Sequence, residues 1–377
     1  MKYIINGKIV LPDGVVEGKA LAFDKKIINI TDKAEAGAEV IDAKGGLVIP
    51  GLVDMHIHGC FGEDASDGSE DGIRVMAKGI LKSGVTSWLP TTMTVSKPEL
   101  EKAFGIIKSL REESKSWDGA EILGINSEGP FINPKKKGAQ AEENIIAPDA
   151  AFVKKYADII KVITIAPEMD QDFACIEELS RDTDILISMG HTDATYEQAC
   201  AAVTHGVNHV THLFNAQTAL QHRNPGVVGA AFTNDVTCEL IADTFHVHKG
   251  LFQLVANIKG DKLILITDST RAGGMPDGEY TLGGQKIFVK GIECRLEDGT
   301  IAGSVLQLNN ALKNFKANTD LPLHKIVALA SLNPATAIGA ADRKGSLEVG
   351  KDADIVITDE SFAVQKTFIG GVLKYEA

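Results

Sequence analysis

The sequence predicts a closed α/β barrel of the (β/α)₈ type, joined to a small β-sandwich domain that both chain termini build. Three observations predict this fold: eight short apolar runs alternate with longer helical patterns, polar residues stand at the ends of these runs, and the two ends of the chain resemble short alternating strands. Strands that alternate with helices indicate a parallel sheet, and eight of them favour a closed barrel.

The eight runs are rich in Val, Ile and Leu, which is typical of strands that are covered on both faces. They cover residues 52–58, 85–91, 121–128, 160–166, 184–191, 207–214, 237–243 and 262–268. The alternative is an open doubly wound sheet, which more often carries a glycine-rich phosphate loop after its first strand. Residues 59–62 (GCFG) do not form such a loop, so the closed barrel is favoured.

Helical periodicity appears in the segments between the runs. The clearest candidates are residues 71–82, 98–115, 150–156, 173–181 and 196–204. The chain ends differ from this pattern, because turn signals such as Asn6-Gly7 and residues 12–14 (PDG) separate short alternating strands there. We therefore expect residues 1–50 and 345–377 to form the small β-domain, and residues 51–344 to form the barrel.

The composition excludes several classes of function. With 38 Lys and Arg against 51 Asp and Glu in 377 residues, the net charge is −13, which argues against nucleic acid or an anionic membrane as a partner. The N-terminus lacks the apolar core of a signal peptide, and no apolar run is long enough to span a membrane. The five cysteines are scattered without a CxxC pair, so we expect a cytoplasmic protein without a disulfide framework.

The residues at the ends of the predicted strands give the strongest functional signal. They are His58, Glu128, His191, His212, Asp243 and Asp268. Because the carboxyl ends of barrel strands converge on one face, where catalytic groups sit, these side chains are expected to meet. Packing alone does not explain six metal-binding or proton-transferring residues at such positions.

The first strand adds a second histidine to this face. Side chains alternate along a strand, so His56 and His58 point to the same side. A single histidine there is more often a hydrogen-bonded core residue, but two of them, with further histidines ending later strands, favour a metal site. Imidazole and carboxylate without thiolate suit Zn²⁺, Fe²⁺, Mn²⁺ or Co²⁺. His209 lies three residues before His212, on the opposite face of its strand, and is expected to be structural.

Several ordered motifs carry a resemblance to a known family. Residues 48–59 (VIPGLVDMHIHG) and 345–357 resemble the opening of the amidohydrolase superfamily and the return into its small β-domain. Six further segments resemble the N-acetylglucosamine-6-phosphate deacetylase family. They are residues 126–131 (NSEGPF), 137–139 (KGA), 190–192 (GHT), 211–216 (THLFNA), 223–226 (RNPG) and 266–268 (ITD). The resemblance covers essentially the whole chain.

The resemblance implies a divalent metal held by Glu128, His191 and His212, with Asp268 as the proton-transfer residue. Asp268 could instead cap a following helix. Zn²⁺ or Fe²⁺ is favoured, with Mn²⁺ or Co²⁺ as alternatives. We further hypothesise that His56 and His58 complete a second metal position, so that one or two ions bind per chain; alternatively, they only form hydrogen bonds around a single ion.

The expected substrate is a phosphorylated N-acetyl amino sugar, and the expected reaction is hydrolysis of its acetamide. The implied substrate-binding residues are Ala139, Gln140, Asn215, Ala216, Arg223, His246, Ala302, Gly303 and Ser304. We predict that Arg223 binds the phosphate with help from His246. Either residue is expected to act across a homodimer interface. The alternatives are a deacetylase for the galactosamine epimer and a non-catalytic scaffold.

Three positions depart from the family pattern. Gln140 stands where a histidine is expected to polarise the substrate carbonyl. Gln217 replaces a methionine, and Thr244 replaces a glycine beside the sugar site. These departures concern the substrate and the rate of the reaction rather than the fold or the metal.

Overall fold

The computed structural model describes all 377 residues and contains the predicted parallel barrel. Its strands are β8 (Leu52–Ile57), β11 (Val85–Thr92), β13 (Ile125–Phe131), β14 (Ile160–Ile165), β15 (Leu186–Met189), β16 (His209–Val210), β17 (Thr237–Ile241) and β18 (Leu263–Ile266). They are hydrogen-bonded in chain order from β8 to β18, and every pair is parallel. The predicted strand 121–128 is divided, since β12 (Glu121–Ile122) ends before β13 begins.

The barrel closes between β18 and β8 without a continuous ladder of its own. Within the two strands, the backbone N–H groups of Val53 and Leu265 donate to carbonyl groups of residues 329–330 instead of to each other's strand. At the carboxyl ends of the two strands, the Asp268 N–H donates to the His56 carbonyl at 2.8 Å. The seam therefore fixes the backbone next to two of the predicted site residues.

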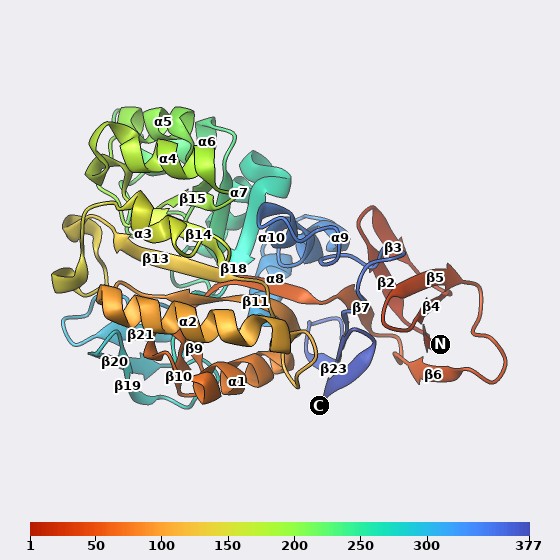
Figure 1. Cartoon of the computed structure of the whole chain (residues 1–377). Helices are drawn as coiled ribbons and strands as arrows, with labels where there is room; N and C mark the ends of the chain where they lie inside the picture. Colours follow the sequence, from red (N-terminus) through yellow and green to blue (C-terminus); the bar gives the residue numbers. More distant parts are fainter.

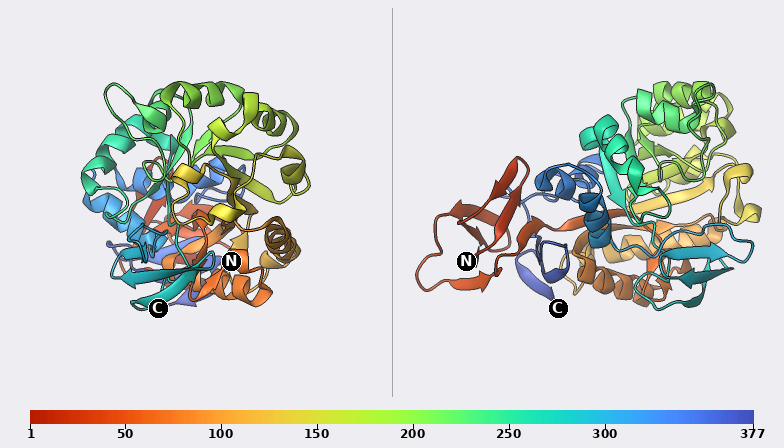
Figure 2. Two further views of the ribbon diagram at one scale, coloured as in Figure 1. Left: turned by 90° about the vertical axis from the view of Figure 1, so that its left-hand side faces the viewer. Right: turned by 180° about the vertical axis from the view of Figure 1, so that it is seen from behind.

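Helices surround the barrel, as the end-on view in Figure 2 shows. They are α1 (Glu70–Gly79), α2 (Lys97–Ser114), α3 (Ala150–Lys154), α4 (Ala174–Asp182), α5 (Tyr196–His205), α6 (Gly226–Thr233), α7 (Phe252–Lys259), α8 (Leu308–Ala317), α9 (Leu323–Ala328) and α10 (Leu332–Ala337). The first five lie where the sequence predicts helices. Capping boxes begin α2 at Ser96 and α5 at Thr195. No helix combines the length and the apolar character that crossing a membrane requires.

The two ends of the chain meet in β-sheets beside the barrel, as the fold prediction expects (Figure 1). The strands are β1 (Lys2–Ile5), β2 (Lys8–Leu11), β3 (Gly14–Val16), β4 (Ala20–Phe23), β5 (Ile27–Thr31), β6 (Glu39–Asp42), β7 (Leu47–Pro50), β22 (Ile355–Thr358), β23 (Val364–Ile369) and β24 (Val372–Glu376). One sheet has the order β5-β4-β1-β6, and the other has the order β24-β23-β22-β7-β2-β3. In the second sheet β22 pairs with β7, so both termini contribute to it. The domain boundaries at residues 50 and 345 stay predictions.

A three-stranded antiparallel sheet that the sequence analysis did not predict follows the last barrel strand. It contains β19 (Gly278–Leu282), β20 (Gln285–Lys290) and β21 (Glu293–Leu296). Figure 1 shows it at the end of the molecule opposite to the terminal sheets. A two-stranded ribbon, β9 (Gly59–Cys60) with β10 (Glu63–Asp64), follows β8.

Candidate active site

Three strands end earlier than their apolar runs predict, because the backbone turns at the site residues. His191, His212 and Asp268 have φ angles of +48°, +26° and +49°. An L-residue rarely adopts this left-handed region, and such strain is concentrated at functional sites. The turns end strands β15, β16 and β18 and direct the three side chains over the mouth of the barrel.

The first group of side chains at the mouth consists of Glu128, His191 and His212. Glu128 Oε1 lies 3.2 Å from His191 Nε2 and 2.9 Å from His212 Nε2. The two Nε2 atoms are 3.1 Å apart, and all three side chains are buried. This is the ligand set that the family resemblance implies.

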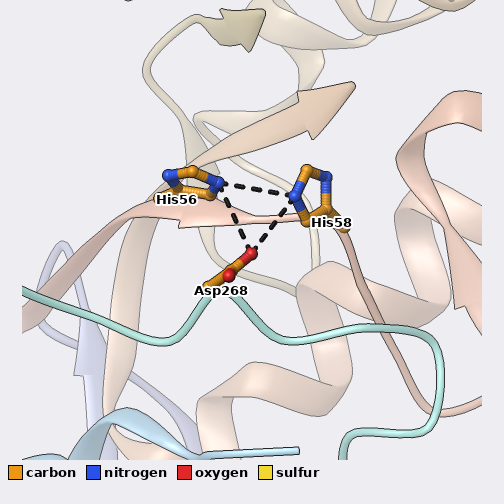
Figure 3. A group of neighbouring side chains, drawn as sticks. All are labelled: His56, His58 and Asp268. Carbon is orange, nitrogen blue, oxygen red and sulfur yellow. Dashed lines mark hydrogen bonds and ion pairs between the residues drawn. The ribbon is translucent and has the colours of Figure 1, made fainter. Parts of the chain in front are cut away.

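The second group consists of His56, His58 and Asp268, as Figure 3 shows. Asp268 Oδ1 lies 3.5 Å from His56 Nε2 and 3.2 Å from His58 Nε2, and the two Nε2 atoms are 3.4 Å apart. The two groups share Glu128, because its Oε2 lies 3.1 Å from His58 Nε2. The structure thus brings together all six residues that were proposed as metal ligands or as the proton-transfer residue.

The four histidines of these groups are oriented alike. In each ring, Nδ1 lies within hydrogen-bonding distance of an oxygen acceptor, so the proton belongs on Nδ1 and the Nε2 lone pair faces the site. The acceptors are the Lys136 carbonyl for His191, the Asn215 carbonyl for His212, the Thr91 carbonyl for His58 and the Glu239 carboxylate for His56. Each Nε2 can therefore direct its lone pair toward a cation bound among the four rings.

The donor set fits divalent metal ions in its chemistry, spacing and charge. Ligands bound to a tetrahedral ion at about 2.0–2.1 Å lie roughly 3.3 Å from one another, and the closest donor distances here are 2.9–3.5 Å. Three buried carboxylates, those of Glu128, Asp268 and Glu239, have histidine partners but no Lys or Arg partner. Two positions that share Glu128 would therefore be filled by cations that offset buried negative charge.

The metal-free site shows how strongly these groups interact. Burial lowers the pKa of His56, but the neighbouring charges of Glu239 and Glu128 outweigh it and raise the pKa to about 9. Burial raises the pKa of Glu239, but His56 and His209 outweigh it and hold that pKa well below its ordinary value. The carboxylate of Glu239 is thus charged inside the barrel.

A cavity of about 380 Å³ opens above the two groups. Six of the predicted substrate-binding residues line it: Ala139, Gln140, Asn215, Ala216, His246 and Gly303. His246 donates from its backbone to Asp243, and its Nδ1 lies 2.6 Å from the Asp243 carboxylate.

Two further predicted substrate-binding residues, Ala302 and Ser304, are buried and do not line the cavity. Ser304 N–H donates to the Asp268 carbonyl at 2.8 Å, and Thr270 N–H donates to the Ser304 carbonyl at 2.9 Å. A Cβ atom on Gly303 would lie 2.6 Å from Thr270 Cγ2, so this close pairing requires glycine. The 302–304 segment therefore supports the backbone of Asp268.

Arg223 does not reach this cavity within its own chain. It is exposed, its guanidinium contacts His222 Nε2 at 2.7 Å, and it lines a neighbouring cavity of about 470 Å³. Lys136 lines both cavities. A role of Arg223 toward the phosphate thus depends on a second chain, as one version of the prediction requires, and it stays a prediction.

The sequence analysis missed residues of three kinds. Lys135 and Lys136 are the only Lys or Arg residues that line the cavity above the metal groups, and the run of three lysines at 135–137 was the available signal. Glu239 lies inside an apolar strand, where a single buried carboxylate was the signal. Leu282, Thr300 and Ile301 line the cavity from the β19–β21 region, and no motif indicated them.

The three departures from the family pattern have distinct local structures. Gln140 Oε1 accepts from Thr94 N–H at 2.7 Å, while its Nε2 donates to Glu128. Gln217 donates to the Thr211 carbonyl. Thr244 has φ +71°, so a β-branched residue occupies a conformation that favours the glycine expected there.

The fold and the site agree with the family comparison. Residues 47–374 match the model of the amidohydrolase family. Members of this family are generally metal-dependent hydrolases built on a (β/α)₈ barrel, with the site at the carboxyl ends of the strands. The chain is thus an amidohydrolase, and every imidazole and carboxylate that was predicted as a metal ligand lies at the mouth of its barrel.

Individual relatives indicate which group of amidohydrolases the chain is similar to. The chain is 41% identical over 336 residues to an N-acetylglucosamine-6-phosphate deacetylase of Bacillus subtilis (strain 168), covering 87% of this chain and 85% of the relative. A crystal structure of N-acetylglucosamine-6-phosphate deacetylase from Pasteurella multocida superposes with a TM-score of 0.94 at 31% identity, covering both chains completely. An N-acetylgalactosamine-6-phosphate deacetylase of Escherichia coli O157:H7 is 32% identical over 365 residues, covering 95% of this chain and 93% of the relative. The chain therefore belongs to the amidohydrolase family and, within it, to the N-acetylglucosamine-6-phosphate deacetylases.

Proposed function

We propose that the protein hydrolyses the acetamide of N-acetyl-D-glucosamine 6-phosphate, releasing glucosamine 6-phosphate and acetate in amino-sugar catabolism. The observation that carries this proposal is the pair of donor groups sharing Glu128 on the floor of the cavity, with Asp268 beside them. The family and the named relatives supply the substrate class.

We propose that Glu128, His191 and His212 hold one divalent ion, and that His56, His58 and Asp268, sharing Glu128, hold a second. Zn²⁺ or Fe²⁺ suits these ligands best, and Mn²⁺ or Co²⁺ is the alternative. A bound divalent ion lowers the pKa of water from about 16 toward 7 and polarises a carbonyl oxygen. The competing version is a single ion, with His56 and His58 only hydrogen-bonded around it.

Asp268 acts as the general base and then as the general acid. Its carboxylate takes a proton from the attacking water and delivers it to the departing amine nitrogen, which is a poor leaving group without protonation. The backbone hydrogen bond to Ser304 and the turn at φ +49° hold Asp268 over the cavity. No α-helix begins at Asp268, which supports catalysis over the helix-cap alternative.

Gln140 lines the cavity, but both ends of its amide are engaged with the protein. The Thr94 N–H fixes the carbonyl end, which leaves the NH₂ group donating to Glu128. We therefore assign Gln140 to orienting Glu128, in place of the carbonyl-polarising role of the histidine expected there.

The substrate phosphate meets cations at the rim of the cavity. A chain with a net charge of −13 needs local positive charge to bind a phosphorylated sugar. Lys135 and Lys136 supply it within the chain, and we propose that Arg223 adds it from the partner in a cytoplasmic homodimer. Asn215, Ala216 and His246 line the sugar-facing wall.

The second candidate is deacetylation of N-acetylgalactosamine 6-phosphate, which the Escherichia coli relative supports. The two sugars differ only in the configuration of the C4 hydroxyl. A non-catalytic scaffold is disfavoured, because every ligand position is filled.

An amine-release assay on N-acetylglucosamine 6-phosphate, its galactosamine epimer and unphosphorylated N-acetylglucosamine tests this proposal. We expect the glucosamine phosphate to be the best substrate, and we expect activity to vanish after chelation and return with Zn²⁺ or Fe²⁺. A clear preference for the epimer would select the second candidate, and no release from any sugar would refute the deacetylase.

A further inference from the structure

Glu239 is a buried carboxylate to which the proposed reaction assigns no role. It lies in the middle of β17, and its side chain is completely buried. Strand alternation directs Glu239 to the barrel interior with Thr237, while Cys238 points to the opposite face. A buried charge is costly unless polar partners surround it, so its contacts indicate why the position holds glutamate.

Both oxygens of Glu239 face donors from neighbouring strands. Oε2 lies 2.9 Å from His56 Nδ1 and accepts from the His212 backbone N–H at 3.0 Å. Oε1 lies 3.2 Å from His209 Nε2. The carboxylate thus touches one residue from each proposed metal position through Oε2, and its Oε1 lies within ion-pair distance of His209.

A series of side chains leads from the amino end of β17 to the second metal position. His209 Nδ1 lies 2.6 Å from Oγ1 of the half-buried Thr237, and His209 Nε2 faces Glu239. Glu239 in turn accepts from His56 Nδ1, which leaves the His56 Nε2 lone pair facing His58 and Asp268. A carboxylate bound to the second nitrogen of a ligating imidazole fixes its tautomer and raises its basicity.

We infer that Glu239 is the positioning residue of the second metal position, and that His209 holds Glu239 in place. Through its hydrogen bond Glu239 fixes the ring of His56 and increases the affinity of His56, His58 and Asp268 for a divalent cation. The inference rests on the two-metal version of the proposed function, and it explains why β16 buries His209 beside a ligand without using it as one.

The first metal position depends less on Glu239. Glu239 reaches His212 only at the backbone N–H, whereas the His212 ring is oriented by the Asn215 carbonyl. His191 is oriented by the Lys136 carbonyl and does not involve Glu239. Loss of the carboxylate is therefore expected to weaken the two positions unequally.

Titration of the metal-free protein with Co²⁺ tests the inference, with calorimetry and the Co²⁺ absorption spectrum as readouts. We expect two ions per native chain. In Glu239→Gln the amide oxygen can still accept from His56 Nδ1 but carries no negative charge. We therefore expect one ion to bind with native affinity and the second to bind about 10-fold more weakly, at the lower end of the usual effect of altering an outer partner of a ligand. His209 can move its proton to Nδ1 and accept from the new amide, so the fold is expected to tolerate the substitution.

Glu121→Gln is the matched control, because Glu121 is also a buried glutamate in contact with a basic side chain but lies far from the metal groups. A merely structural role predicts that both variants lose stability and that both bind two Co²⁺ ions as the native chain does. Native binding of both ions by Glu239→Gln would therefore overturn the inference. A ceiling of one ion in the native chain would overturn it as well, since no second position would then exist.

A measurement on the native chain covers the case in which the variant does not fold. With ¹⁵N-labelled histidine and Zn²⁺ bound, the His56 ring is expected to carry its proton on Nδ1, whereas a proton on Nε2 would refute the inference. Neither readout involves deacetylation, so failure of the proposed reaction would be seen separately in the amine-release assay.

Discussion

Each end of the barrel carries a cluster of charged side chains that is at least partly buried, and the two clusters differ in how their charges are balanced. At the amino ends of the strands, the cations Lys26, Arg343 and Lys344 face the anions Glu121, Asp352 and Asp354. Toward the carboxyl ends, Glu128, Asp268 and Glu239 have histidines as their only basic partners. The first cluster is complete within the chain, whereas the second has lone pairs and negative charge in excess.

This difference separates a structural cluster from a functional one. Lys344 is buried and touches three carboxylates at 2.7–3.1 Å, which leaves no position for an external ion. The Nε2 atoms of His191 and His212 at the other end lie 3.1 Å apart, close to carboxylates that have no Lys or Arg partner. Burial and charge alone do not distinguish the two clusters, but the absence of a Lys or Arg that balances the carboxylates does.

Asp268→Asn is expected to give the largest effect. Turnover should fall about 10²–10⁴-fold, because the amide cannot take a proton from water, while Glu128, His191 and His212 still hold an ion. Steady-state kinetics and metal analysis measure both quantities. Asp352→Asn makes the same chemical change in the other cluster, and it should lower stability without lowering turnover. A native kcat in Asp268→Asn would remove its catalytic role.

Lys344→Met should show the reverse behaviour. Removing the central cation leaves Glu121 and Asp354 buried with fewer partners, which typically costs about 3–5 kcal/mol of stability. Urea unfolding measures this loss, and metal content should stay native. Lys8→Met removes an exposed ion pair with Glu360, which solvent screens, and should lower stability far less. Equal losses in the two variants would contradict the structural role of the buried cluster.

Arg223→Ala tests the phosphate-reading role. We expect kcat/KM for the phosphorylated sugar to fall by the equivalent of about 2–4 kcal/mol, with a much smaller loss for the plain sugar. Lys136→Ala should show the same preference for the phosphorylated substrate, and Lys78→Ala on the distant, exposed face of α1 should show no loss. An equal loss on both sugars would exclude phosphate recognition by the altered residue.

Stability should depend on pH through Glu121. Burial raises its pKa, but Lys344 and Arg343 outweigh burial and hold the pKa below the ordinary value of 4.5. Its contribution is therefore complete above pH 4.5 and is lost as the pH falls through the folded-state pKa. The stability difference between the native chain and Glu121→Gln should shrink below about pH 4.5. A difference that grows on acidification would contradict this sign.

The smallest expected effect concerns Thr244. Glycine adopts its φ of +71° without the steric cost that threonine has, so Thr244→Gly should raise stability by roughly 1 kcal/mol. Thr204→Gly, at an exposed position of helix α5, should lower stability by about 0.3–0.5 kcal/mol. Thermal unfolding compares the two variants, and a loss of stability in Thr244→Gly would argue against strain at this position.

Most of the proposed metal site could be predicted from the sequence, because His58, Glu128, His191, His212 and Asp268 follow apolar strands whose carboxyl ends must converge. It also predicted the barrel and the contribution of both termini to a small β-domain. The exact ends of β15, β16 and β18 could not be predicted, since they depend on left-handed turns that only the folded site imposes.

Other features depend on contacts between distant segments, which spacing does not specify. In the sequence, Glu239 is a single polar residue within an apolar strand. Its role becomes visible only in the fold, where β8 and β16 place His56 and His209 beside it. The exposure of Arg223 follows from the course of its loop, and the β19–β21 sheet carries no motif that links it to the cavity. The motifs thus predicted the ligands but not the residues that orient them.

Anomalous diffraction from crystals saturated with Zn²⁺ tests the central claim most directly, because it locates metal ions without reference to activity. The account predicts two peaks, one among Glu128, His191 and His212 and the other among His56, His58 and Asp268, with Glu128 between them. A single peak would contradict the two-metal site, and the absence of both peaks would contradict the metal-dependent site altogether.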